Sequence, residues 1–95
     1  MAWEKDEARA FGEHIRVLRR AAGLSQEALA YRAGITKNQV QLIEAGRGSA
    51  REKGPISNPR MKTLFGLAEA LGIAPVDLLA ATSGSATSES SPLPE

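Results

Sequence analysis

The chain has 95 residues, a length that suits a single domain with one hydrophobic core and not a core plus a separate catalytic domain. It contains no cysteine, which excludes disulfides, thiolate zinc sites and thiol nucleophiles, and one histidine cannot build a metal site alone; we therefore expect no metal and no cofactor. No apolar run approaches the ~20 residues of a membrane-spanning helix, and residues 1–9 are charged where a signal peptide would be apolar, so we expect a cytoplasmic protein without a membrane partner.

The net charge of +1 conceals an uneven distribution of charge. Residues 37–62 contain six basic and two acidic residues, a local charge of +4: Lys37, Arg47, Arg51, Lys53, Arg60 and Lys62 against Glu44 and Glu52. Such a segment favours contact with a polyanion, although a solvated charged surface is the commoner cause of a basic cluster.

The first helix is expected from Glu4 or Ala8 to Ala22, with Gly23 at its C-terminal end. Apolar residues recur there at spacings of three and four, which is the periodicity of one buried helix face: Phe11, Ile15, Leu18 and Ala22.

Two short helices should follow, because two N-cap residues, Ser25 and Thr36, stand only eleven positions apart. Gly34 ends the first of these helices, and Gly46 ends the second. Gln39 completes a capping box with Thr36. The residues expected to face the core are Leu29, Ala30, Ala33, Val40 and Ile43. Helix starts this close together predict a tight helical corner.

Residues 47–57 are predicted to form an enlarged basic loop, since they contain two glycines and a proline and show no apolar periodicity. Asn58 is the expected N-cap and Pro59 the first residue of a fourth helix, which ends at Gly72, and Pro75 starts a short fifth helix. Their expected core residues are Met61, Leu64, Leu67, Ala68, Leu71, Val76, Leu78 and Leu79. Together these elements form one domain over residues 1–81, followed by a disordered tail rich in Ser, Thr and Pro over residues 82–95.

Several motifs occur in a characteristic order: Gly23-Leu24-Ser25-Gln26-Glu27-Ala28-Leu29-Ala30, Ala33-Gly34-Ile35-Thr36, Val40, Ile43-Glu44, Gly46, Asn58-Pro59 and Leu67-Ala68-Glu69-Ala70-Leu71-Gly72. Their succession resembles the Xre family, the Cro and phage-repressor type of helix-turn-helix protein, over about residues 11–80. The resemblance implies an all-α, five-helix lambda-repressor-like fold in which the second and third helices form the helix-turn-helix. It also implies a regulator and not an enzyme.

In this family the second helix of the motif, called the recognition helix, enters the major groove with its N-terminus first. The resemblance therefore implies base contacts from Thr36, Lys37, Asn38, Gln41 and Leu42. Lys37 offers donors suited to guanine, and Asn38 can bind adenine through two hydrogen bonds. Leu42 departs from the family pattern, which often has a polar or basic residue there; it either packs against a thymine methyl group or is covered by the long loop.

The resemblance also implies contacts to the DNA backbone. Gln26 matches a glutamine that binds a phosphate and braces the first residue of the recognition helix. The loop and the start of the fourth helix add cations and free amides, so the expected backbone contacts are Gln26, Arg47, Arg51, Lys53, Arg60, Met61 and Lys62. Arg19 and Glu44 match a family pair that forms a partly buried salt bridge.

These expectations describe a protein that binds specific sequences of double-stranded DNA and regulates transcription, as a repressor, in the form of a homodimer on a pseudo-palindromic operator. Two alternatives remain open. An antitoxin uses the same domain to bind its operator and also to bind a partner toxin protein. A protein-interaction adaptor would have no salt-dependent affinity for DNA.

Overall fold

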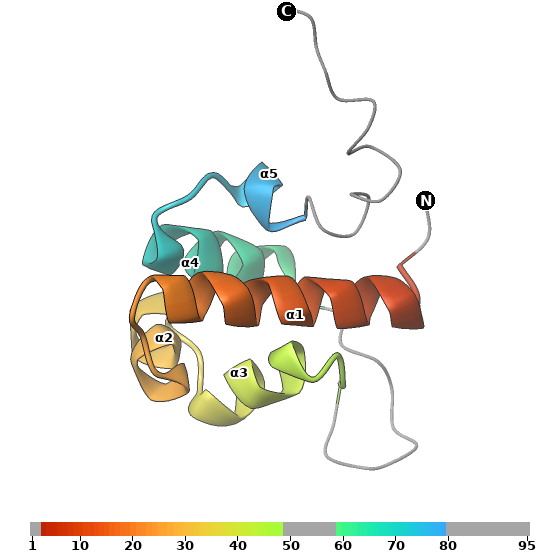
Figure 1. The fold of residues 1–95 in the computed structure, drawn as a ribbon, viewed down its shortest axis with the longest axis horizontal. Helices are drawn as coiled ribbons and strands as arrows, with labels where there is room; N and C mark the ends of the chain where they lie inside the picture. The colour runs from red at the N-terminus through yellow and green to blue at the C-terminus, as the bar shows by residue number, and fades with distance from the viewer. Residues whose placement is uncertain (1–2, 49–58, 80–95) are drawn as a thin grey trace, which may run out of the picture.

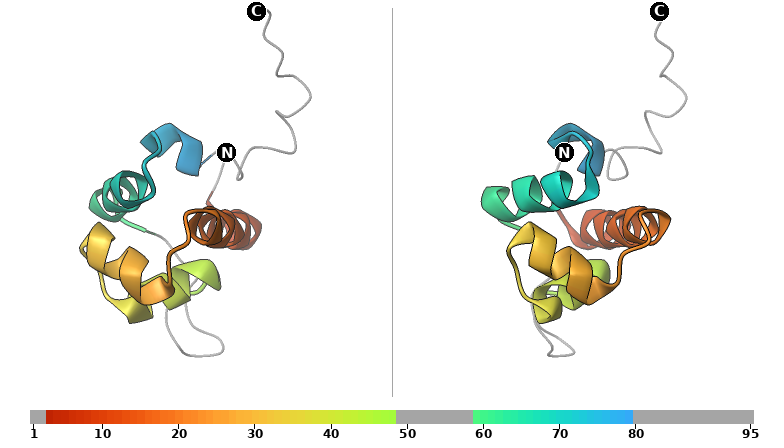
Figure 2. Two further views of the ribbon diagram at one scale, coloured as in Figure 1. Left: turned by 60° about the vertical axis from the view of Figure 1, so that its left-hand side comes forward. Right: turned by 90° about the vertical axis from the view of Figure 1, so that its left-hand side faces the viewer.

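The computed structural model describes residues 3–48 and 59–79, and within these ranges the chain forms five α-helices and no β-strand. The helices are α1 (Lys5–Ala21), α2 (Gln26–Ala33), α3 (Lys37–Glu44), α4 (Met61–Leu71) and α5 (Pro75–Leu78). Helix α1 crosses the middle of the molecule, and α3 and α5 lie on opposite sides of α1 (Figures 1 and 2). The all-helical fold expected from the sequence is confirmed. Among the described helices, none is long and apolar enough to cross a membrane.

The corner between α2 and α3 is built by local hydrogen bonds that the sequence predicted. The Ser25 hydroxyl accepts a bond from the amide of Ala28 at 3.0 Å and so caps α2. The Thr36 hydroxyl accepts a bond from the amide of Gln39 at 3.0 Å, and the Gln39 side chain accepts one from the amide of Thr36 at 2.9 Å. Between the two helices Gly34 has a φ of +77°, which a residue with a Cβ rarely adopts. The predicted helix-turn-helix is therefore present.

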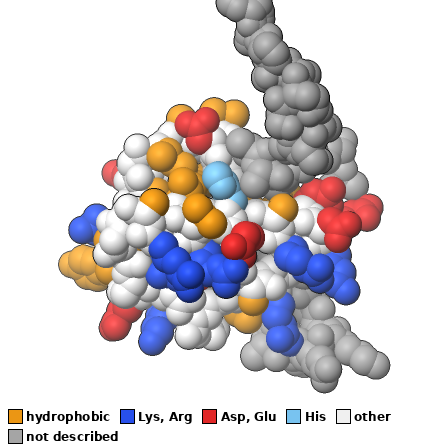
Figure 3. Space-filling model, viewed as in Figure 1, with side chains coloured by type: hydrophobic (Ala, Val, Ile, Leu, Met, Phe, Trp, Pro, Cys, Tyr) orange, Lys and Arg blue, Asp and Glu red, His pale blue; other side chains and the backbone are white. Residues whose placement is uncertain are grey.

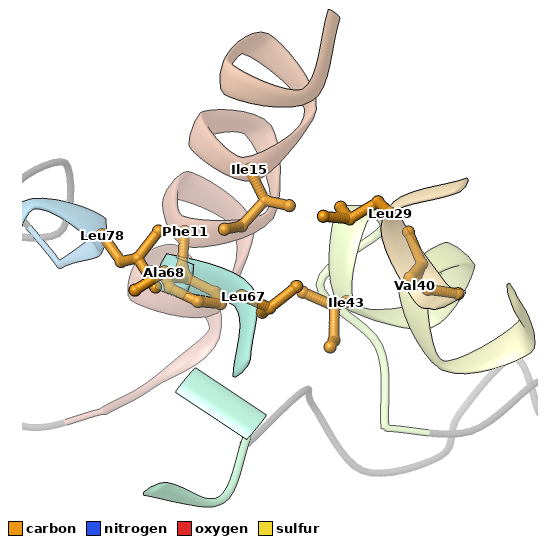
Figure 4. Packing of buried hydrophobic residues seen from close by; sticks show 9 residues of the cluster. Phe11, Ile15, Leu29, Val40, Ile43, Leu67, Ala68 and Leu78 are labelled. Atoms are coloured by element: carbon orange, nitrogen blue, oxygen red, sulfur yellow. The ribbon is translucent and has the colours of Figure 1, made fainter. Parts of the chain in front are cut away.

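The core lies between α1 and the other four helices, each of which contributes to it (Figure 4). Its buried members are Ala8, Phe11, Ile15, Leu29, Ala30, Val40, Ile43, Leu67, Ala68 and Leu78. Four residues predicted for the core are instead exposed: Ala22, Met61, Val76 and Leu79. Ala22 lies beyond the last turn of α1, and α5 has only four residues, so that just one of its apolar side chains, Leu78, points inward.

The start of α4 also differs from the prediction. Pro59 is not the first helical residue, because Arg60 is the N-cap with an extended backbone (ψ 159°) and α4 begins at Met61. The φ of proline suits extended backbone as well as helix, so the residue alone does not locate a helix start. Met61 thus sits in the outermost turn and is 67% exposed. Asn58 and residues 49–57 lie outside the described residues.

Helix α1 approaches the end of α3 so closely that only glycine fits at the contact. A Cβ atom on Gly12 would lie 2.2 Å from the carbonyl oxygen of Ile43 and 2.7 Å from that of Glu44. At the opposite side of α1, the half-buried His14 binds the backbone of α5, with Nε2 3.0 Å from the carbonyl oxygen of Asp77. These contacts set the positions of α3 and α5 against the central helix.

Replacing Gly12 with alanine should therefore lower the free energy of unfolding by about 2–3 kcal/mol, because two backbone carbonyl groups must move to admit one methyl group. Denaturation in urea measures the effect. Val17→Ala, at an exposed position on the same helix, is the control and should change stability by less than about 0.5 kcal/mol. A Gly12→Ala protein as stable as the control would refute the close approach.

Candidate nucleic-acid interface

The exposed surface of α3 is polar and lies at one edge of the molecule. Lys37, Asn38 and Gln41 are exposed, and Leu42 is half-buried. Val40 and Ile43 are buried in the core, so the helix is anchored through one face and presents the other. Side chains on a well-anchored helix are suited to recognising the surface of a binding partner, because packing of the helix holds them in position.

Thr36 has a structural task in this arrangement. Its hydroxyl oxygen accepts the bond from the Gln39 amide and lies 3.3 Å from the Gln39 side-chain oxygen, to which it donates its proton. A base contact from the Thr36 hydroxyl would have to compete with this bond.

One flank of α3 faces the start of α4 across a hollow of about 490 Å³. Gln39 and Leu42 line it from α3, so Leu42 lies in the wall of the hollow. Its basic lining residues are Arg47, Arg60 and Lys62. The first intrahelical bond of α4 runs from the amide of Leu64 to the carbonyl of Arg60, which leaves the preceding amides, including those of Met61 and Lys62, without an intrahelical acceptor.

The opposite flank of α3 faces α1 and the start of α2. Lys37 lines a hollow of about 410 Å³ together with Arg20 and Gln26. Gln41 lines a neighbouring hollow of about 230 Å³ together with Arg16 and Arg20. Both flanks of α3 therefore carry basic side chains, while Arg51 and Lys53 lie outside the described residues.

A buried ion pair holds the end of α3 against α1. The Arg19 Nε donates to Glu44 Oε2 at 2.6 Å and the second guanidinium nitrogen of the fork, Nη2, to Oε1 at 3.2 Å. The Arg19 Nη1 donates to the carbonyl oxygen of Leu24 at 2.9 Å, and the Gln26 side-chain amide donates to Glu44 Oε1 at 3.0 Å. The two charged side chains are 10% and 5% exposed, and the described residues contain no buried side-chain polar atom without a partner.

Gln26 braces a different residue from the one expected. The resemblance implied a bond to the first residue of the recognition helix, but the amide of Gln26 reaches the last one, Glu44. The Glu44 carboxylate is a stronger acceptor than a neutral group, since hydrogen bonds to ionised groups are roughly twice as strong.

A family model described as a helix-turn-helix domain matches residues 10–81. The chain belongs to this helix-turn-helix family. An uncharacterized HTH-type transcriptional regulator, y4dJ of Sinorhizobium fredii, is 35% identical over 71 residues, which cover 75% of this chain and 80% of the relative. With these matches the chain is an Xre-type helix-turn-helix protein that binds DNA and regulates transcription.

Solved structures resemble this helix-turn-helix protein over most of their length. The restriction-modification controller protein C.AhdI of Aeromonas hydrophila has a TM-score of 0.65 at 35% identity, covering 79% of this chain and 98% of the other. The hypothetical transcription factor NHTF of Neisseria has a TM-score of 0.64 at 28% identity, covering 80% of this chain and 76% of the other. The clp gene regulator ClgR of C. glutamicum, with a TM-score of 0.63 at 23% identity over 83% and 91%, shows the same fold.

Two basic residues near the recognition helix were not predicted from the sequence. Arg16 and Arg20 line the hollows beside α3, yet they precede the basic segment that the charge count singled out. Their spacing of four, which puts two side chains on one face of a helix, was the available signal. Within the described residues, no group of acidic or histidine side chains could hold a metal ion.

Removing Glu44 from the helix-turn-helix protein should be strongly destabilising, because Arg19 would remain buried without its counter-ion. We expect Glu44→Ala to lower the free energy of unfolding by about 3–5 kcal/mol in urea denaturation. Glu69→Ala, at an exposed acidic position on α4, is the control and should be nearly neutral. Equal stability of the two variants would show that the ion pair does not hold α3 in place.

Proposed function

We propose that this protein represses transcription as a homodimer that occupies a pseudo-palindromic operator in promoter DNA. The observation that carries the proposal is the polar, exposed face of α3, anchored through the core and lying between two flanks that carry basic side chains. The B-DNA major groove is ~12 Å wide, which admits one α-helix, and a sugar-phosphate strand borders it on each side. Because its ligand is DNA, we assign the protein to the cytoplasm.

Base reading is assigned to the exposed residues of α3 and to the half-buried Leu42. Asn38 offers a donor and an acceptor that match the N7 and N6 groups of adenine, and Lys37 offers donors to guanine O6 and N7. Gln41 lies one turn further along the helix, near the α1 flank. Leu42 has an apolar side chain that suits the methyl group of thymine. Thr36 contributes chiefly by starting the helix.

Backbone binding is assigned to residues around α3. Arg47, Arg60 and Lys62 line the hollow at the start of α4, where the free amides of Met61 and Lys62 form part of the positive end of the helix dipole. Gln26 keeps one side-chain N–H and its carbonyl oxygen beyond the bond to Glu44, and the N–H is available for a phosphate. Arg51 and Lys53 are assigned to the DNA backbone as well, because they are basic residues of the same segment. Contacts of this kind set register and orientation without reading sequence.

Selection of binding sites from random duplexes tests the proposal with the full chain. We expect an enriched pseudo-palindrome whose half-sites are ~34–36 Å apart or a multiple of that distance. The reason is that the two α3 helices of a two-fold dimer enter major grooves separated by a whole number of turns of the DNA duplex. Binding to the selected site should weaken steeply as salt rises, since phosphate contacts release counterions.

Enrichment of one half-site only, with a monomer in sedimentation of the complex, would refute the homodimer. Absence of salt-dependent DNA affinity would refute the whole proposal and favour the adaptor. Reporter expression from a promoter that carries the selected site then distinguishes repression from activation.

The variant Asn38→Ala should lose preference at one base pair of each half-site, by a discrimination of about 1–3 kcal/mol, and keep its nonspecific affinity. Affinity for a panel of single-base variants of the site measures this change. Lys62→Ala is the matched control, for which binding should weaken equally on every duplex in the panel. If Asn38→Ala behaves like Lys62→Ala, Asn38 is not a base-reading residue.

A further inference from the structure

Helix α1 carries a row of basic side chains along its outer face. Residues at spacings of four, four, three and four share this face, with one acidic residue among them: Lys5, Arg9, Glu13, Arg16 and Arg20. Figure 3 shows basic side chains along the face of the molecule where α1 lies. Glu13 forms an ion pair with Arg16. Arg20 is exposed and has no ion pair among the described residues.

The C-terminal half of this row borders the recognition helix. Arg16 and Arg20 line the hollow of about 230 Å³ whose α3 side is formed by Gln41, Glu44 and Ala45. Arg20 also lines the hollow of about 410 Å³ that contains Lys37, at the start of α3. The close contact between Gly12 and the end of α3 keeps the two helices at a fixed separation. The two arginines therefore flank α3 from its first residue to just past its last.

The other flank of α3 already has cations in the proposed interface. Arg47, Arg60 and Lys62 lie on the side of α4. A helix in the major groove has one sugar-phosphate strand on each side, and the cations near α4 reach only one of them. On the α1 side, the exposed cation at the start of α3 is Lys37, which is assigned to bases. Among residues 3–48 and 59–79, the opposite strand therefore has no basic partner assigned to it unless α1 supplies one.

We propose that Arg16 and Arg20 of α1 bind phosphates of the DNA strand on the side of α3 opposite to α4. Their guanidinium groups present planar donors that match phosphate oxygens. Glu13 opposes this contact, since its carboxylate pairs with Arg16 and adds negative charge to the same face. The assignment rests on the proposed function and adds a fourth helix, α1, to the contacts already proposed for α2, α3 and α4.

The test measures how the dissociation constant of the full-length protein for its selected site depends on salt. Each lost phosphate contact should reduce the slope of log K against log salt by about 0.9. For Arg16→Ala/Arg20→Ala the slope should be about 1.8 shallower, so that raising salt from 50 to 200 mM weakens the variant about twelvefold less than the parent. The loss of affinity should be equal on specific and nonspecific duplexes, because phosphates carry no sequence.

Two further variants sharpen the result. Arg20→Ala and Arg32→Ala each remove one exposed arginine from the last turn of a helix, but Arg32 lines none of the hollows beside α3. Only Arg20→Ala should lower the salt slope. Glu13→Gln should raise affinity for every duplex, because it frees Arg16 and removes the opposing charge. Thermal denaturation of each variant confirms that the fold is retained.

The outcomes separate this inference from the proposed function. A parent protein with a steep salt slope, together with Arg16→Ala/Arg20→Ala and Arg32→Ala proteins of unchanged slope, would overturn the α1 contact alone. A Glu13→Gln protein that binds no more tightly would also count against it. A parent protein without salt-dependent affinity would overturn both.

Discussion

The ion pair between Arg19 and Glu44 joins three helices at one point. Glu44 is the last residue of α3, Arg19 comes from α1, and Gln26, the first residue of α2, donates to the same carboxylate. The arginine also binds the carbonyl of Leu24, so the segment between α1 and α2 is tied to the end of α3. Breaking such a buried pair leaves a charge without a partner, which costs far more than the intact pair contributes. The orientation of the recognition helix depends on this network, because α1 and α2, the two helices that pack most extensively against α3, are both connected to it there.

Two other features act on the same end of α3. The carbonyl oxygens of Ile43 and Glu44 lie against Gly12, where a side chain would collide with them, and the guanidinium of Arg19 lies near the negative end of the helix dipole. The other end of α3 is closed by the capping box of Thr36 and Gln39, and both of these residues are exposed. The buried ion pair and the close helix contact therefore lie at the end of α3 away from the proposed ligand, while the end proposed to enter the groove keeps its polar groups. A helix positioned in this way loses little conformational freedom on binding.

The parts of the fold that could be predicted from the sequence are those set by nearby residues. The two helix caps and the turn between them could be predicted from residue type, because each is formed by residues at most four positions apart. The residues concerned are Ser25, Gly34, Thr36 and Gln39. Gly12 gave no such signal, because its partner lies on another helix far along the chain. The pairing of Arg19 with Glu44 came from the family resemblance, and no spacing rule would have produced it. The prediction that Pro59 is the first residue of α4 was wrong, because the φ angle of proline fits both an extended and a helical residue. The basic row on α1 was overlooked because its role depends on which helix lies beside it.

The distribution of charge around α3 has a consequence for specificity. Phosphate contacts strengthen binding to every DNA sequence alike, so each added cation raises competition from nonspecific sites, and the ratio of specific to nonspecific affinity decides occupancy of the operator. The chain has a net charge of only +1, and Glu13 lies within the basic row of α1. With the proposed contacts, a carboxylate at that position would weaken the attraction to all duplexes without touching the proposed base-reading face of α3. On this argument the acidic residue preserves specificity, because it limits nonspecific affinity and leaves discrimination to the few side chains that reach the bases.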